Sequence, residues 1–175
     1  MLIETERLVI RDVTEEDGPA FAEMAADGSL KDIGFDRDCG KWMAKWTAEA
    51  RELAGLDRPD RAYLAYTAAL KGEDTAIGSV GCSYYEDLQE TGITYFIGSQ
   101  YRNCGYAVEA VKAYLQYFFS RYRNRPRIVA VIRAENVPSW KTAEKAGFRL
   151  VERKLYQDLY DEQAAPYHFY ECLRR

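Results

Sequence analysis

A short turn around Gly105 has the residue types of an anion-binding site. Residues 101–107 read Tyr-Arg-Asn-Cys-Gly-Tyr-Ala and separate an alternating, strand-like run from a long helical pattern. The first amides of a helix lack partners within the helix, and the helix dipole adds about half a positive charge at that end. Gly105 lets the backbone approach a ligand closely, and Arg102 offers a forked donor that suits phosphate oxygens. The spacing therefore indicates phosphate binding, with an ordinary strand-to-helix turn and a solvated arginine as the alternative.

Hydrophobic spacing predicts the elements on either side of this turn. Residues 93–97 alternate as in a strand, and apolar residues then recur at intervals of three or four, which predicts a helix. These apolar residues are Ala107, Val111, Leu115, Phe118 and Tyr122. The β-branched run at 127–133 predicts a buried strand after the helix. Strand, helix and strand in this order predict a parallel crossover.

The rest of the chain predicts strands and helices in the order β-α-α-β-β-β-α-β-α-β-β. Around the crossover we expect a strand at 7–11, a helix with Thr14 as its N-cap, a helix at about 40–54, strands at 62–70, 77–85 and 92–98, a helix at 138–146 ending at Gly147, and strands at 150–155 and 167–173. Short turns between the three middle strands predict an antiparallel meander.

Composition restricts the class of protein. The chain has 175 residues, of which 47% are hydrophobic, so we expect one domain, 1–175, with its own core. A net charge of −4 argues against a nucleic-acid partner. No apolar run approaches the ~20 residues that span a bilayer, so we expect no membrane partner and a cytoplasmic protein. The four cysteines lack C-x-x-C spacing and His168 is the only histidine, so no metal site is expected.

Several short motifs resemble those of the GNAT acyltransferases. The segment 102–107 is similar to the R/Q-x-x-G-x-G/A signature of that superfamily, with Tyr95-x-Ile97 before it and Glu109-Ala110 after it. Residues 136–139 and 144–148 resemble the N-x-x-S and E-K-x-G-F elements. Residues 5–11 are similar to the opening strand of the ribosomal-protein N-terminal acetyltransferase branch. The resemblance covers nearly the whole chain.

The resemblance implies a fold and a cofactor. The fold would be a mixed α/β structure, with a mostly antiparallel sheet that splays apart at its centre and is flanked by helices. The cofactor would be acetyl-coenzyme A (acetyl-CoA), whose pantetheine arm would pair with the main chain of Tyr95 and Ile97 and contact Asn136 and Ser139. The pyrophosphate would lie on the turn, held by Arg102 and by the amides of Asn103, Cys104, Gly105, Tyr106, Ala107 and Val108.

The resemblance also implies catalytic roles. Many GNAT enzymes carry a tyrosine acid where this chain has Ala143, so Ser139 is the expected acid, with a helix-capping hydroxyl as its alternative role. Many relatives carry a glutamate base where this chain has Gly92. Glu90 is the nearest carboxylate whose side chain would point to the same face of the strand as position 92. Alternatively, Glu90 is a solvated turn residue without a catalytic role. Tyr84, Tyr85 and Tyr156 could face the acceptor, although tyrosines are more often core residues.

The implied reaction is direct attack of a primary amine on acetyl-CoA in a ternary complex. The acceptor would be a protein or peptide α-amino group, and the protein a monomer or homodimer. A small-molecule amine is one alternative acceptor. A coenzyme A binding module with little or no turnover is a second alternative, which the missing tyrosine and glutamate suggest.

Overall fold

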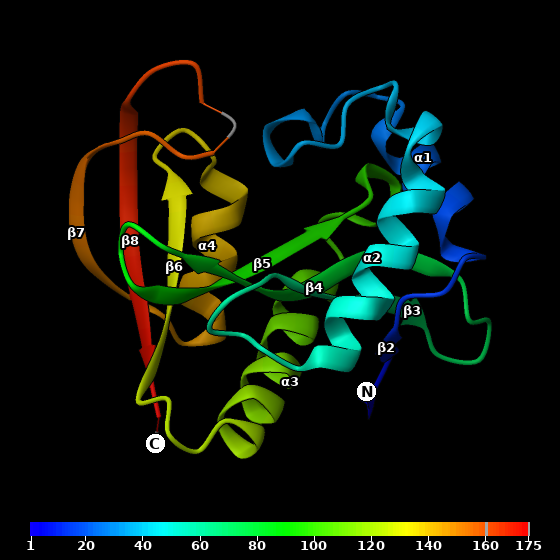
Figure 1. The fold of residues 1–175 in the computed structure, drawn as a ribbon, viewed down its shortest axis with the longest axis horizontal. Coiled ribbons are helices and arrows are strands. Elements are labelled where there is room, and N and C mark those ends of the chain that lie inside the picture. The colour runs from blue at the N-terminus through cyan, green and yellow to red at the C-terminus, as the bar shows by residue number, and fades with distance from the viewer. Residues whose placement is uncertain (160, 175) are drawn as a thin grey trace.

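The strands form one mixed sheet, shown in Figure 1. A computed structural model describes residues 1–159 and 161–174, and over these ranges the sheet has eight strands in the order β1-β2-β3-β4-β5-β6-β8-β7. They are β1 (Leu2–Glu4), β2 (Leu8–Asp12), β3 (Leu64–Leu70), β4 (Ala76–Tyr85), β5 (Glu90–Ile97), β6 (Arg127–Arg133), β7 (Arg149–Tyr156) and β8 (Ala165–Leu173). Neighbouring strands are antiparallel except β5 and β6, which are parallel. The mixed, mostly antiparallel sheet that we predict is confirmed.

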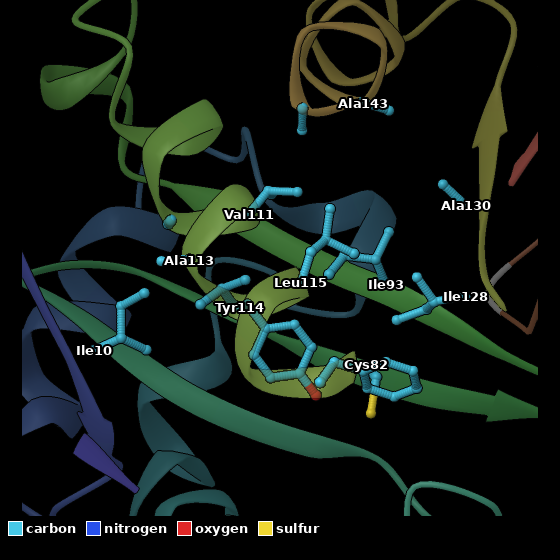
Figure 2. Packing of buried hydrophobic residues seen from close by; sticks show 14 of the residues in the cluster. Ile10, Cys82, Ile93, Val111, Ala113, Tyr114, Leu115, Ile128, Ala130 and Ala143 are labelled. Carbon is cyan, nitrogen blue, oxygen red and sulfur yellow. The ribbon is translucent and has the colours of Figure 1, made fainter. Parts of the chain in front are cut away.

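Helices cover both faces of this sheet. They are α1 (Asp17–Ala25), α2 (Met43–Leu56), α3 (Tyr106–Arg121) and α4 (Val137–Ala146). On one face, α3 and α4 bury Val111, Tyr114 and Ala143 against Ile93 and Ile128 of the sheet, as Figure 2 shows. On the other face a second cluster forms around α1 and α2. Each large apolar side chain that is fully buried contributes about 1.5–3 kcal/mol, so the two clusters fix where the helices lie on the sheet.

The sheet splays between β5 and β6. Their only register pair is Gly92 with Val129, whereas β6 pairs with β8 along its full length. Beyond Gly92 the two strands diverge toward their carboxyl ends (Figure 1). The amide of Gly98 donates to the carbonyl of Ile77 at 2.9 Å, and main-chain groups alternate along a strand, so those of Tyr95 and Ile97 point away from β4, toward the gap. The predicted central splay is confirmed.

Two local predictions differ from the structure. The predicted elements do not include β1, which pairs with β2 through three residues. Such a short apolar stretch shows no period. Thr14 is not the N-cap of α1, because the helix begins at Asp17 and the residue before it, Glu16, makes no side-chain cap. Instead the carboxylate of Asp17 accepts a hydrogen bond from the Thr14 amide at 2.8 Å.

The predicted end of α4 at Gly147 is confirmed. Gly147 has a φ of 109°, and its amide and that of Phe148 donate back to carbonyls of the last turn of the helix. Over the described residues, no helix combines the length and apolar character that a membrane crossing requires.

Candidate active site

The turn before α3 presents a row of backbone donors. Gly105 has a φ of 83° and Asn103 a φ of 62°, a left-handed conformation that glycine and asparagine tolerate best. Among the described residues, the six successive amides from Asn103 to Val108 find no hydrogen-bond acceptor. Residues 102–105 are exposed. The turn is therefore an open cluster of N–H groups at the positive end of a helix.

Arg7 holds this turn from the loop between β1 and β2. Its Nη1 donates to the carbonyl of Cys104 at 2.8 Å, its Nε donates to Glu109 Oε2 at 2.7 Å, and the guanidinium lies 4.6 Å from the centre of the Tyr106 ring. In a planar trans peptide the C=O and N–H point in opposite directions. Because Arg7 holds the Cys104 carbonyl, the Gly105 amide points away from Arg7.

Glu109 completes this contact, which we call the Arg7–Glu109 clamp. Its Oε1 accepts hydrogen bonds from Thr5 Oγ1 at 2.6 Å and from the Arg7 amide at 2.9 Å. Partial burial would raise the pKa of Glu109, but the hydrogen bonds from Thr5 and Arg7 outweigh burial and lower it. The sequence motifs include all three residues, yet nothing in their spacing indicates that they meet.

Arg102 braces the turn from the other side. Its Nε donates to the carbonyl of Ile97 at 3.1 Å and its Nη2 donates to Ser29 Oγ at 2.9 Å. Two of its three guanidinium nitrogens are therefore engaged by the protein, rather than forming the free fork that we expect for phosphate. In this structure Arg102 connects the turn to the end of β5 and to the loop after α1.

The start of α4 contacts β5 across the gap. Asn136 is the N-cap of α4, because its side-chain oxygen accepts from the Ser139 amide at 3.2 Å. The hydroxyl of Tyr95 donates to the Ser139 carbonyl at 2.7 Å and lies 3.0 Å from Ser139 Oγ. Burial raises the pKa of Tyr95 to about 12, although the hydrogen bond with Ser139 opposes that rise. The capping role that we consider for Ser139 thus belongs to Asn136, and the Ser139 hydroxyl contacts Tyr95 instead.

Comparison with known proteins identifies the family. The model of the acetyltransferase (GNAT) domain matches residues 7–149. The chain belongs to the GNAT acetyltransferase family. It is 30% identical to the uncharacterized N-acetyltransferase YnaD of Bacillus subtilis over 152 residues. This aligned stretch covers 85% of this chain and 83% of YnaD.

Solved structures share the fold of this GNAT acetyltransferase. An acetyltransferase of the GNAT family from Bacillus anthracis superimposes with a TM-score of 0.80 and 23% identity, covering 99% of this chain and 98% of the other. An acetyltransferase from Salmonella typhimurium that modifies the N-terminal serine of a ribosomal subunit protein superimposes with a TM-score of 0.78 and 14% identity, covering 100% of both chains.

The expected N-acetyltransferase activity and its acetyl-CoA cofactor are confirmed at the level of the family. The residues of this GNAT acetyltransferase fit that cofactor. The unpartnered amides of 103–108 suit a pyrophosphate, and the open edge of β5 offers main-chain groups to the amides of a pantetheine arm. Acetyl-CoA supplies the activated acetyl group.

Glu90, the expected base of this GNAT acetyltransferase, is paired with an arginine. Arg127 Nε donates to Glu90 Oε1 at 3.0 Å, and Arg127 also contacts Glu171 at 3.2 Å. Glu90 begins β5, five residues before Tyr95, which corresponds to about 16 Å along a strand. The structure therefore does not bring Glu90 together with Ser139.

A different carboxylate, that of Asp158, acts electrostatically on Tyr85, the tyrosine beside Gly92. A Cβ at Gly92 would lie 2.4 Å from the Tyr85 ring, so Tyr85 fills the space beside Gly92. Burial raises the pKa of Tyr85, and the next largest contribution is the charge of Asp158. Burial also raises the pKa of Asp158, and the like charges of Asp161 and Asp87 add to that rise, although the hydrogen bond from the Leu159 amide opposes it.

The sequence draws attention to Tyr85 but not to Asp158. The loop between β7 and β8, which carries Asp158, shows no pattern. The end of β7 contacts the hairpin between β4 and β5, where the Tyr156 hydroxyl donates to Asp87 at 3.3 Å, and Asp158 follows two residues later.

Proposed function

We propose that this enzyme transfers the acetyl group of acetyl-CoA to the α-amino group of a protein or peptide. The observation that carries the proposal is the row of unpartnered amides before α3, beside the open edge of β5. The likeness to the Salmonella typhimurium enzyme, which acts on a protein N-terminus and matches over the full length of both chains, supports this acceptor class. So do the similarity of residues 5–11 to the N-terminal acetyltransferase branch and the serine at position 139.

In this proposal the backbone does most of the cofactor binding. The amides of Asn103, Cys104, Gly105, Tyr106, Ala107 and Val108 hold the pyrophosphate. The main chain of Tyr95 and Ile97 holds the pantetheine arm, with Ile97 contributing its amide because its carbonyl already accepts a hydrogen bond from Arg102. Asn136 uses its side-chain oxygen for the α4 cap, so it offers its amide N–H groups to the cofactor. Arg102 acts mainly as a brace for the turn, with one guanidinium nitrogen left for phosphate.

The reaction needs a base for the amine and a proton for the departing sulfur. Ser139 Oγ is the proposed proton donor, because it is at the helix start that borders the gap. Asp158 is the proposed base, in place of Glu90, because a carboxyl whose pKa is raised by burial is a better proton acceptor near neutral pH. Attack is direct in this proposal, since Cys39 and Cys82 are buried, Cys104 is on the turn assigned to pyrophosphate, and no role is assigned to Cys172 on β8.

An acceptor panel tests the function. Thiol release from acetyl-CoA is measured with peptides that have a free N-terminus, with the same peptides blocked at the N-terminus but containing lysine, and with small primary amines. We expect turnover with free N-termini and none with blocked peptides. Turnover confined to lysine side chains or to small amines would overturn the acceptor class, and no turnover with any amine would favour a binding module.

Paired substitutions test the base. We expect Asp158→Asn to lower kcat/KM by about 10²–10⁴, the usual range for a general base, and to remove the rise of kcat/KM with pH. Glu90→Gln is the matched control and should change kcat/KM by less than about threefold. The opposite ranking of the two variants would assign the base to Glu90.

A further inference from the structure

The hydroxyl of Tyr95 makes two contacts with one residue, Ser139. It lies 2.7 Å from the Ser139 carbonyl oxygen and 3.0 Å from Ser139 Oγ. Both side chains are half-buried, and Tyr95 extends from β5 to the first turn of α4. This contact therefore joins the two sides of the gap.

Counting protons limits what these contacts can be. A phenol has one proton to donate, and a carbonyl oxygen can only accept. While Tyr95 donates to the Ser139 carbonyl, the contact with Oγ is a hydrogen bond only if Ser139 donates its own proton to Tyr95. If Ser139 instead donates its proton elsewhere, the Tyr95 proton can turn from the carbonyl to Oγ. The same heavy-atom positions thus accommodate both proton arrangements.

The raised pKa of Tyr95 makes the phenol a stable donor. At neutral pH it keeps its proton, since burial disfavours the phenolate. A neutral donor beside Oγ stabilises the charge that develops on the oxygen when its proton leaves. The Tyr95 hydroxyl also fixes the rotamer of Ser139, because Oγ must remain within reach of it.

We propose that Tyr95 is a positioning residue that orients the Ser139 hydroxyl and stabilises it as its proton is given up. The inference rests on the proposed role of Ser139. In the transfer, the amine nitrogen forms a bond to the acetyl carbon and the carbon–sulfur bond breaks, with its electron pair leaving on sulfur. The Oγ proton passes to that sulfur while Tyr95 donates a hydrogen bond to Oγ. The proton lost by the amine passes through the base to solvent, which returns one to Ser139.

Tyr170 provides a matched control for this proposal. Its hydroxyl donates to Glu144 Oε1 at 3.1 Å, so it also connects a strand to α4, but at the other end of the helix. Its pKa is likewise raised to about 12, with burial as the main cause. Tyr170→Phe therefore removes a comparable hydroxyl without touching Ser139.

Kinetics separate positioning from a structural tether. We expect Tyr95→Phe to lower kcat about tenfold, with the KM for acetyl-CoA and the calorimetric affinity for coenzyme A unchanged within about twofold, and Tyr170→Phe to leave kcat nearly unchanged. In a Ser139→Ala background, Tyr95→Phe should have little further effect. Equal kcat losses in the two tyrosine variants, or an undiminished Tyr95→Phe effect without Ser139, would overturn the inference.

A measurement without cofactor tests the contact itself. With 3-fluorotyrosine at position 95, the ¹⁹F resonance should shift on Ser139→Ala and not on Tyr170→Phe. No shift on Ser139→Ala would contradict the contact. The two proposals also fail differently. If Ser139→Ala leaves kcat unchanged, the proposed role of Ser139 is refuted. If Ser139→Ala lowers kcat but Tyr95→Phe does not, only the proposed role of Tyr95 is refuted.

Discussion

Cys104 is an exposed thiol within the row of unpartnered amides. Its Sγ lies 3.5 Å from the Arg102 carbonyl, whereas Cys39 and Cys82 are buried. A ligand on this turn would cover the thiol and add negative charge beside it. The chemistry of a single side chain can therefore report whether the turn is occupied.

We predict that Cys104 is alkylated faster than the other three cysteines and that acetyl-CoA slows its reaction. The expectation follows from its exposure and from the proposed position of the pyrophosphate. Peptide mass spectrometry at successive times, with and without acetyl-CoA, gives the rate at each cysteine, and Cys172, which is half-buried, serves as the internal control. Equal Cys104 rates in the two conditions would contradict the site assignment.

Single residues show what a sequence pattern can and cannot predict. The need for glycine at position 105 is predictable, because a motif that brings backbone close to an anion requires an unusual dihedral. The use of Arg102 is not, since its partners, Ile97 and Ser29, are a main-chain carbonyl and a distant loop residue. Asp158 is likewise hidden, because its raised pKa comes from burial in the folded protein and from the like charges of Asp161 and Asp87.

At the scale of elements, the Arg7–Glu109 clamp connects the β1–β2 loop to the first turn of α3. It orients the Cys104–Gly105 peptide through the carbonyl of Cys104, on the side opposite the Gly105 amide. The Arg7 guanidinium contacts three groups at once, namely a carboxylate, a main-chain carbonyl and an aromatic ring. Lysine keeps the charge but lacks the planar fork that allows this.

We therefore expect Arg7→Lys to weaken the calorimetric affinity for coenzyme A about tenfold while kcat at saturating acetyl-CoA changes less than twofold. The reason is that the amides of the turn remain present but are less well oriented. Arg51→Lys is the control, because Arg51 forms an exposed pair with Glu15 at 3.2 Å, away from the turn. Equal affinities in the Arg7 and Arg51 variants would show that the clamp does not orient the binding turn.

Elements differ in how well their sequences predict them. Periodic segments such as α3 are predictable because their buried positions follow the period of the helix. The start of α1 is not, because it is set by Asp17, whose carboxylate binds Arg11 and Thr67 as well as the Thr14 amide. The gap between β5 and β6 is predicted from the family resemblance alone, since no pattern in either strand indicates that the two strands diverge.

At the scale of the whole molecule, Asp17 joins α1 to the sheet. It is 3% exposed and accepts from both terminal nitrogens of Arg11, at 2.8 and 2.9 Å, and from Thr67 Oγ1 at 2.7 Å. Burial alone would raise the pKa of Asp17, but these hydrogen bonds outweigh burial and lower it. The ionised Asp17 carboxylate therefore stabilises the fold fully at pH values above its unfolded pKa of about 3.9. This stabilisation is lost as the pH falls through the lower pKa that Asp17 has in the folded protein.

We predict that Asp17→Asn lowers the free energy of unfolding at pH 7 by about 3 kcal/mol, because it leaves Arg11 without its buried partner. The difference from the parent protein should shrink as pH falls through the folded pKa. Asp74→Asn is the matched control, since Asp74 contacts the same arginine at 2.9 Å but is 71% exposed, and its loss should cost less than about 1 kcal/mol. Urea titrations at several pH values measure both, and similar losses in the two variants would contradict the prediction.

The divergence of β5 and β6 also makes the stability of the folded protein depend on the concentration of the cofactor. With one register pair between them, the two parts of the sheet lack the main-chain bonds that an intervening strand would supply. A cofactor in the gap would provide such bonds to the native state alone, so at a concentration of 100 times Kd it would add about 2.7 kcal/mol to the free energy of unfolding. Amide hydrogens in the second half of β5 should then exchange more slowly with coenzyme A present. In a cell the abundance of this enzyme would follow the coenzyme A pool, because proteolysis removes the unliganded protein first.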